Sequence, residues 1–159
     1  MIKIDKNHYF LLGILLLSLF LNIFQLWNTG FSNTYYAVAV KSMMKNPANF
    51  LFNSYDEYGY MTLDKPPVGF WVQTIFAFIF GFRGWVLMLP QVLAGTGSCL
   101  LLYFIIKKYF NEPAALLSAL ILALTPIFVT ASRTNMIDMQ YIFLSLAALY
   151  FLILSVEKK

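Results

Sequence analysis

The sequence contains little charge, a single cysteine and a single histidine. Only 11% of its 159 residues are charged and 60% are hydrophobic, whereas a soluble globular domain carries about 25% charged residues. A chain of this size cannot hide so much apolar surface from water, because small domains leave much of their surface exposed. The composition excludes a soluble domain and predicts an integral membrane protein.

The shortage of cysteine and histidine restricts the chemistry that the chain can perform. Cys99 has no partner for an intrachain disulfide, and it lies in an apolar run, where a thiol packs as a small hydrophobic side chain. One thiol cannot form a metal site, and no metal or cofactor motif is recognisable. A divalent cation held by carboxylates remains an alternative.

The net charge of +4 does not indicate nucleic-acid binding, because the basic residues form no continuous basic face. They occur in pairs beside apolar runs, as in membrane proteins, which retain Lys and Arg on the cytoplasmic side. The expected surroundings are therefore membrane lipids, with no nucleic-acid partner. The pairs are Lys3 and Lys6, Lys107 and Lys108, and Lys158 and Lys159.

Four apolar runs are long enough to cross the membrane as α-helices, since a hydrocarbon core of roughly 30 Å takes about 20 residues. No small-x-small cleavage site follows the first run, which predicts a retained span rather than a signal peptide. In this span Asn22 and Gln25 share one face and predict hydrogen bonds to a neighbouring helix. The predicted spans are about 9–27, 84–106, 113–131 and 137–156.

A fifth apolar run, Pro66 to Phe82, decides the topology. As a helix it is about 25 Å long and too short to cross. If it crossed, the later basic pairs would lie outside, opposite the N-terminal lysines. We therefore predict a juxtamembrane helix, one membrane domain over 1–159 and both termini in the cytoplasm. The loop 28–83 and the short loop 132–138 then share the extracytoplasmic side.

The long loop contains a predicted helix from Asn33 to Lys45. Ser32 or Asn33 is a suitable N-cap, and Asn46-Pro47 ends the helix. Its apolar residues fall on one face, which predicts an interfacial amphipathic helix lying on the membrane. The residues of this face are Tyr36, Ala39, Val40 and Met43.

Asp56, Glu57, Asp64 and Lys65 form the densest group of polar residues in this loop. Pro66-Pro67 holds the backbone of Lys65 extended and begins the next helix. A lysine and an aspartate are thus presented at a helix N-terminus, where free N–H groups favour phosphate. The alternative is an ordinary solvated turn.

Arg133 and Asp138 flank the break between the last two predicted spans. Asp138 begins an apolar run, where a carboxylate is costly unless it is paired or hydrated, and Arg133 is the expected partner. The alternative role for Asp138 is to interact with the helix dipole. Most aromatic residues near the boundaries are predicted to be interfacial anchors, and sugar stacking by one or two is the less favoured alternative.

A series of short motifs runs in a fixed order along the chain. They are Gly30-Phe31-Ser32-Asn33-Thr34-Tyr35-Tyr36, Lys41-Ser42-Met43, Asn49-Phe50-Leu51-Phe52, Asp64-Lys65-Pro66-Pro67, Trp71, Leu89-Pro90-Gln91 and Arg133-Thr134-Asn135-Met136-Ile137-Asp138. In this order they resemble the N-terminal part of glycosyltransferase family 39, the membrane-embedded protein mannosyltransferases and aminoarabinose transferases of the C type. The resemblance implies the four-span part of that fold, juxtamembrane helices in the first external loop and a polyprenyl-phosphate-linked sugar donor.

The chain departs from the family pattern in two ways. Many members carry an Asp-Glu pair early in the first external loop, where this sequence has Ser32-Asn33, so the catalytic base cannot be assigned by resemblance. Members are also several hundred residues long, whereas this chain ends after four predicted spans. A fragment, a split gene product whose partner chain carries the remaining spans, and a degenerate remnant are the alternatives.

The leading hypothesis is a membrane glycosyltransferase that moves a hexose such as mannose from the lipid donor to an extracytoplasmic acceptor. The candidate bases are Asp64, Asp56 and Asp138, in that order. The candidate substrate-binding residues are Lys65, Arg133, Asn33, Tyr35 and Tyr36. The alternative is a non-catalytic subunit or remnant that binds lipid phosphate or packs with a longer partner. A transporter is favoured less, because the spans are nearly free of charge.

Overall fold

The computed structural model describes residues 6–157 and contains eight α-helices with one 3-10 turn within that range. No strand occurs among these residues, although one isolated bridge joins Ser54 and Thr62. The predicted all-α architecture is confirmed, while Lys3, Asp5, Lys158 and Lys159 lie outside the described residues. The helices are α1 (Lys6–Ile23), α2 (Thr34–Met43), α3 (Pro47–Leu51), α4 (Val68–Phe80), α5 (Gly84–Tyr109), α6 (Glu112–Leu124), α7 (Pro126–Ser132) and α8 (Asp138–Glu157), with η1 (Leu26–Asn28) after α1.

Three of these helices, α1 with its following turn, α5 and α8, are long and apolar enough to cross a membrane, and α6 with α7 forms a fourth candidate. The chain bends by 63° between α6 and α7. The predicted span over 113–131 therefore consists of two helices joined at a break, and its crossing of the membrane stays a prediction. Pro126 has no N–H for the helical ladder, and it keeps the backbone of Thr125 extended.

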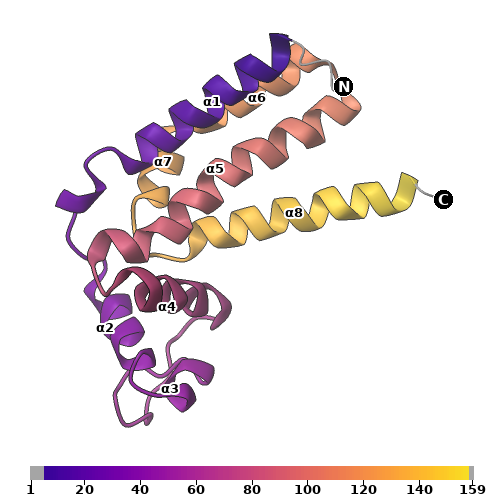
Figure 1. The fold of residues 1–159 in the computed structure, drawn as a ribbon. Coiled ribbons are helices and arrows are strands. Elements are labelled where there is room, and N and C mark those ends of the chain that lie inside the picture. Colours follow the sequence, from indigo (N-terminus) through magenta and orange to yellow (C-terminus); the bar gives the residue numbers. More distant parts are fainter. Residues whose placement is uncertain (1–5, 158–159) are drawn as a thin grey trace.

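The long helices form a bundle in which α1 begins, α5 ends, α6 begins and α8 ends at the same end (Figure 1). Ion pairs join the helices there: Lys107 contacts Glu112 at 2.7 Å, and Lys108 pairs with Glu157. The basic pair in the last turn of α5 and the starts of α1 and α6 thus share one end of the bundle. Which side of the membrane this end faces stays a prediction.

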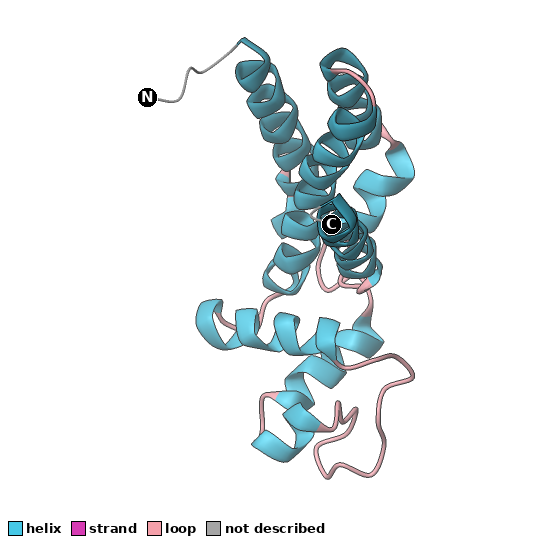
Figure 2. Ribbon diagram, turned by 90° about the vertical axis from the view of Figure 1, so that its right-hand side faces the viewer, coloured by secondary structure: helices cyan, strands magenta, loops and turns pink. Residues whose placement is uncertain are grey.

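The shorter helices α2, α3 and α4 lie beyond the opposite end of the bundle, with α4 crossing it (Figure 2). Thirteen residues give α4 a length of about 20 Å, too short to cross a membrane. At the junction between this region and the bundle, a Cβ on Gly84 would overlap the backbone carbonyl of Gly30. This close approach requires glycine at position 84.

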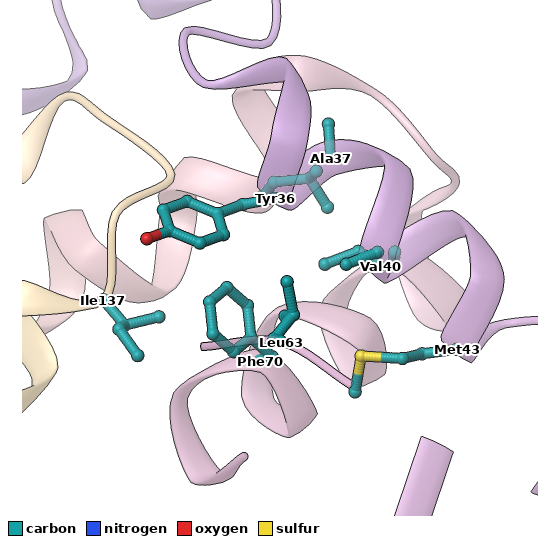
Figure 3. Packing of buried hydrophobic residues seen from close by; sticks show 10 residues of the cluster. Tyr36, Ala37, Val40, Met43, Leu63, Phe70 and Ile137 are labelled. Carbon is teal, nitrogen blue, oxygen red and sulfur yellow. The ribbon is translucent and has the colours of Figure 1, made fainter. Parts of the chain in front are cut away.

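The N-cap of α2 is Asn33, whose side chain accepts a hydrogen bond from the backbone N–H of Tyr36 at 3.3 Å. The apolar face of α2 packs against α4, the loop before α4 and Ile137, so this face is buried in protein and not turned to lipid as predicted (Figure 3). Phe70 of α4 is fully buried against this face, where lipid was expected to be in contact. The place of α2 at the membrane interface stays a prediction. The buried cluster consists of Tyr36, Ala37, Ala39, Val40, Met43, Leu63, Phe70, Ala77, Leu87 and Ile137.

The hydrogen bonds predicted for Asn22 and Gln25 do not form. Asn22 is 1% exposed, and neither side-chain atom has a hydrogen-bond partner among the described residues. Because α1 ends at Ile23, Gln25 lies beyond the helix in a left-handed conformation and no longer shares a face with Asn22.

Candidate functional site

Lys65 and Asp138 form an ion pair between two segments that are 73 residues apart, with 3.4 Å between Nζ and Oδ1. The pair is reachable, since 27% of the lysine side chain and 48% of the aspartate side chain are exposed. Burial disfavours the charged lysine, but the Asp138 carboxylate and the Tyr36 hydroxyl outweigh it and raise the pKa of Lys65 above its ordinary value. Lys65 is therefore positively charged and partly exposed at this end of the bundle.

The hydrophobic cluster explains how two distant residues come together. Leu63 lies two residues before Lys65 and Ile137 one residue before Asp138, and both are buried in the cluster (Figure 3). The buried side chain of Asn53 also donates a hydrogen bond of 2.9 Å to the backbone carbonyl of Lys65. Apolar anchors and one amide thus fix both charged residues.

Two tyrosines border the pair. The ammonium of Lys65 lies 5.8 Å from the centre of the Tyr36 ring, a distance at which a cation is attracted to an aromatic face. Tyr141 lies three residues after Asp138 on the same face of α8. Its hydroxyl is buried, lies in the electric field of Lys65, Asp138 and Tyr36, and has no hydrogen-bond partner among residues 6–157.

The two loops that were predicted to share one side are in contact through bonds between Asn33 and Asn135, while the side of the membrane stays a prediction. The Asn135 side chain accepts from the Asn33 N–H at 2.9 Å and donates to the Asn33 carbonyl at 2.8 Å. Gln73 in turn donates to the Asn135 carbonyl at 2.7 Å. In this structure both the side chain and the backbone of Asn33 are used to hold the fold.

Asp64 and Tyr35 lie together beside the ion pair. Asp64 is exposed and forms no ion pair within the part of the chain that the structure describes. Partial burial of Tyr35, followed by the nearby Asp64 carboxylate, raises the pKa of the Tyr35 hydroxyl. Asp64 is thus an accessible carboxylate whose charge acts on the Tyr35 hydroxyl.

Asp56 lies apart from this group and stabilises the turn to which it belongs. Its carboxylate accepts hydrogen bonds from the backbone N–H groups of Tyr58 at 2.9 Å and Met61 at 2.7 Å. Burial opposes the ionised form, but these hydrogen bonds outweigh it and lower the pKa of Asp56. The expected convergence of Asp56 and Glu57 with Lys65 is not observed, because Glu57 pairs with Lys45 at 3.3 Å.

Arg133 does not pair with Asp138, and that prediction was wrong. Its guanidinium donates to the backbone carbonyls of Leu21 at 2.7 Å and Phe24 at 2.6 Å, at the end of α1. The last carbonyls of a helix have no partner within the helix, and a cation there also interacts favourably with the dipole. Arg133 therefore joins α7 to α1, and Lys65 pairs with Asp138 in place of Arg133.

The described residues contain no group of three or more His, Cys, Asp or Glu side chains that would hold a metal ion. An apolar groove with a volume of about 310 Å³ lies close to the ion pair, between α4, α5 and α8. It includes Gln140, two residues after Asp138, and otherwise has an almost entirely apolar lining. Its apolar residues are Val68, Val72, Phe76, Pro90, Leu93, Ala94, Phe143 and Leu144.

Sequence reasoning missed Asn53, Asn135 and Tyr141 as parts of this site. The spacing of Tyr141, three residues after Asp138, was a usable signal, because such residues share a helix face. Asn135 lies inside a motif that had been quoted for its charged ends. The role of Asn53 depends on a left-handed backbone, with φ of 56°, that its sequence does not reveal.

Residues 64–159 match the family described as dolichyl-phosphate-mannose-protein mannosyltransferase. "Putative mannosyltransferase YkcB" of Bacillus subtilis (strain 168) is 47% identical over 148 residues, which are 93% of this chain and 21% of that protein. "Putative mannosyltransferase YycA" of the same strain is 50% identical over 133 residues, covering 84% of this chain and 19% of that protein.

An uncharacterized protein of Aquifex aeolicus (strain VF5) is 30% identical over 120 residues, 75% of this chain and 23% of that protein. The chain thus spans about a fifth of the length of the curated relatives. No solved structure matches it significantly. Because the family match covers more than half of the chain and includes Lys65 and Asp138, this multi-pass membrane protein belongs to the dolichyl-phosphate-mannose-protein mannosyltransferase family.

Proposed function

We propose that this chain forms the donor-binding part of a membrane glycosyltransferase that moves a hexose such as mannose from a polyprenyl-phosphate carrier to an extracytoplasmic acceptor. The observation that supports this best is the ion pair of Lys65 with Asp138, which is reachable from outside and bordered by Tyr36 and Tyr141. A lysine ammonium is a compact point charge that suits a phosphate.

In the transfer, the acceptor hydroxyl oxygen attacks the anomeric carbon, and the bond between that carbon and the phosphate oxygen breaks. The bonding electrons leave with the lipid phosphate. Lys65 stabilises the negative charge that develops there, which lowers the barrier because the cation is already in place. Asp138 holds the ammonium in position and neutralises it when no phosphate is bound.

The acceptor proton goes to a carboxylate. Asp64 is our first candidate, because it is exposed, lies beside the lysine in sequence and has no ion pair within the described residues. Asp138 is second, and Asp56 is last because backbone N–H groups already occupy its oxygens. General-base assistance contributes about 10²–10⁴-fold when the base reaches the proton.

The polyprenyl tail is placed in the groove between α4, α5 and α8, which is apolar and adjoins the ion pair. This places α2, α3 and α4 at the extracytoplasmic surface and both termini in the cytoplasm, as in the four-span part of a C-type glycosyltransferase. Single cysteines at Glu57 and Asn111, both exposed, test this in a Cys99→Ala background. Glu57→Cys is expected to react with an impermeant thiol reagent from outside, and Asn111→Cys is not. The reverse pattern would refute the orientation.

The central test measures polyprenyl phosphate binding to the protein in lipid nanodiscs. Lys65→Ala is expected to weaken binding strongly, and Lys65→Arg to restore only part of it, because the planar guanidinium must fit the same space. Lys41→Ala is the matched control, since Lys41 is exposed on α2 and its substitution removes the same charge. Equal losses in the two alanine variants would indicate general electrostatic attraction and would remove the special role of Lys65.

A further inference from the structure

Four aromatic rings form a continuous row from the hydrophobic cluster to the surface. The centre of the Phe70 ring is 5.0 Å from that of Tyr36, and Tyr36 is 5.3 Å from Tyr35. Tyr35 and Tyr55 follow at 4.7 Å, with only 26° between their planes. Phe70 is 0% and Tyr36 5% exposed, whereas Tyr35 is 39% exposed. The row therefore ends in a stacked, accessible pair of rings.

Two charged neighbours in the sequence lie beside successive rings of this row. The ammonium of Lys65 lies over the inner Tyr36 ring. Asp64 is the residue before Lys65, and its exposed carboxylate is near enough to add to the effect of burial in raising the pKa of the Tyr35 hydroxyl. A cation thus lies over the inner part of the row, and the charge of a carboxylate without an ion pair in residues 6–157 acts on the outer part.

This combination matches the two sides of a pyranose ring. The C–H groups of a sugar carry partial positive charge and pack against the negative face of an aromatic ring. Sugar hydroxyls donate strong, charge-assisted hydrogen bonds to a carboxylate. A ligand that carries phosphate next to a sugar can place its phosphate at Lys65 and its sugar at the outer rings near the Asp64 carboxylate.

We propose that the stacked pair Tyr35–Tyr55, with Asp64 at its edge, is the subsite for the pyranose ring of the lipid-linked donor. This rests on the proposed function, because it takes Lys65 as the position of the phosphate. The sugar is bonded directly to that phosphate, so it lies one step further out along the row. Tyr55 is then a specificity-determining residue that separates a sugar-bearing lipid from the bare lipid phosphate.

The neighbouring pair Tyr58 and Tyr60 lacks these properties and supplies the control. Tyr58 and Tyr60 are 85% and 88% exposed. Their ring centres are 6.2 Å apart, with 36° between the ring planes. The two carboxylates that precede them are already engaged, since Glu57 pairs with Lys45 and Asp56 accepts hydrogen bonds from backbone N–H groups. An exposed tyrosine of the same loop is therefore available without a stacked partner or an unpaired carboxylate.

The test compares a short polyprenyl phosphate with its mannosyl ester as ligands of the protein in nanodiscs. Tyr55→Leu is expected to weaken binding of the mannosyl ester about three- to tenfold and to leave binding of the bare phosphate unchanged. Tyr55→Phe keeps the ring and is expected to bind both lipids as the wild type does. Tyr58→Leu is expected to change neither affinity.

The outcomes separate this inference from the proposed function. Equal loss of both lipids in Tyr55→Leu would show a structural role and overturn the subsite, and so would no loss of either lipid. If Lys65→Ala weakens both lipids while Tyr55→Leu weakens neither, the phosphate site stands without the sugar subsite. If Lys65→Ala weakens neither lipid, the proposed function fails and the inference fails with it.

Discussion

The region of residues 28–83 and the helix bundle treat their buried polar groups in opposite ways. In the first region, Asn49 donates to the Ser42 hydroxyl at 3.1 Å and to the Glu57 carbonyl at 3.0 Å. In the bundle, both side-chain atoms of Asn22 and of Gln91 lack hydrogen-bond partners among the described residues. Asn53 and Gln73 each leave one oxygen unpartnered, but their nitrogens are bonded.

This difference shows where the chain specifies a single geometry. A buried amide that makes several hydrogen bonds fixes its neighbours in one arrangement, because every alternative leaves polar atoms unsatisfied. The bundle is held instead by apolar contacts, by the end ion pairs and by Arg133 on the carbonyls of α1. Precision is thus concentrated in the region that presents Asp64 and Lys65.

The largest expected effect lies at the junction of the two regions. Gly84→Ala places a methyl group on the backbone carbonyl of Gly30, which cannot move away as a flexible side chain would. We expect a loss of about 3 kcal/mol or failure to fold. Gly13→Ala is the control, because nothing lies within 4 Å of its added Cβ. Similar thermal unfolding midpoints for the two variants in detergent would show that the junction is not rigid.

The second effect tests the polar network of the loop region. Asn49→Ala removes the donor that the Ser42 hydroxyl and the Asp56 and Glu57 carbonyls share. We expect a loss of roughly 2–3 kcal/mol, because buried acceptors are left unsatisfied. Asn111→Ala removes an exposed N-cap of α6 and is expected to cost about 1 kcal/mol. Equal unfolding midpoints in the two variants would contradict the contrast between the regions.

A third change is expected to have the opposite sign. Asn22→Leu replaces a buried, unpartnered amide of the bundle with an apolar side chain of similar size. Stability is expected to stay the same or to rise by about 1 kcal/mol, since a desolvated polar group is removed. The backbone carbonyl near Arg133 is retained. A clear fall in the unfolding midpoint would reveal a polar partner for Asn22 and weaken the comparison.

The sequence predicted the helices of the bundle well, because length and apolarity alone decide whether a helix can cross a membrane. The requirement that basic pairs share one side also placed the loops of Lys65 and Asp138 on a common side, and these two residues are paired in the structure. The sequence shows Pro126 near the end of the third predicted span, but the 63° bend there could not be predicted, since a proline fixes no angle by itself.

The sequence misled where two partners of the same chemistry were available. Arg133 is closer to Asp138 in sequence than Lys65 is, yet it binds the carbonyls of α1. The apolar face of α2 gave the same pattern for lipid as for the protein interior, and Phe70 covers it. Local spacing cannot choose between such partners, because the choice depends on which helices pack together.

The smallest expected effect concerns a charge that stabilises only its own turn. Because the pKa of Asp56 is lowered in the folded protein, its contribution to stability is fully present above its ordinary value of 3.8 and is lost as the pH falls through the lower, folded value. Asp56→Asn is therefore expected to lower the unfolding midpoint slightly at pH 7, and the difference from wild type is expected to vanish in more acidic solution. Asp64→Asn, which removes the same charge from an exposed carboxylate without an ion pair in residues 6–157, is the matched control for the loss of one negative charge. A difference for Asp56→Asn that stays constant as the pH is lowered from 7 into the acid range would mean that the amide disturbs the turn by its shape, and that the charge of Asp56 adds nothing to the loop region.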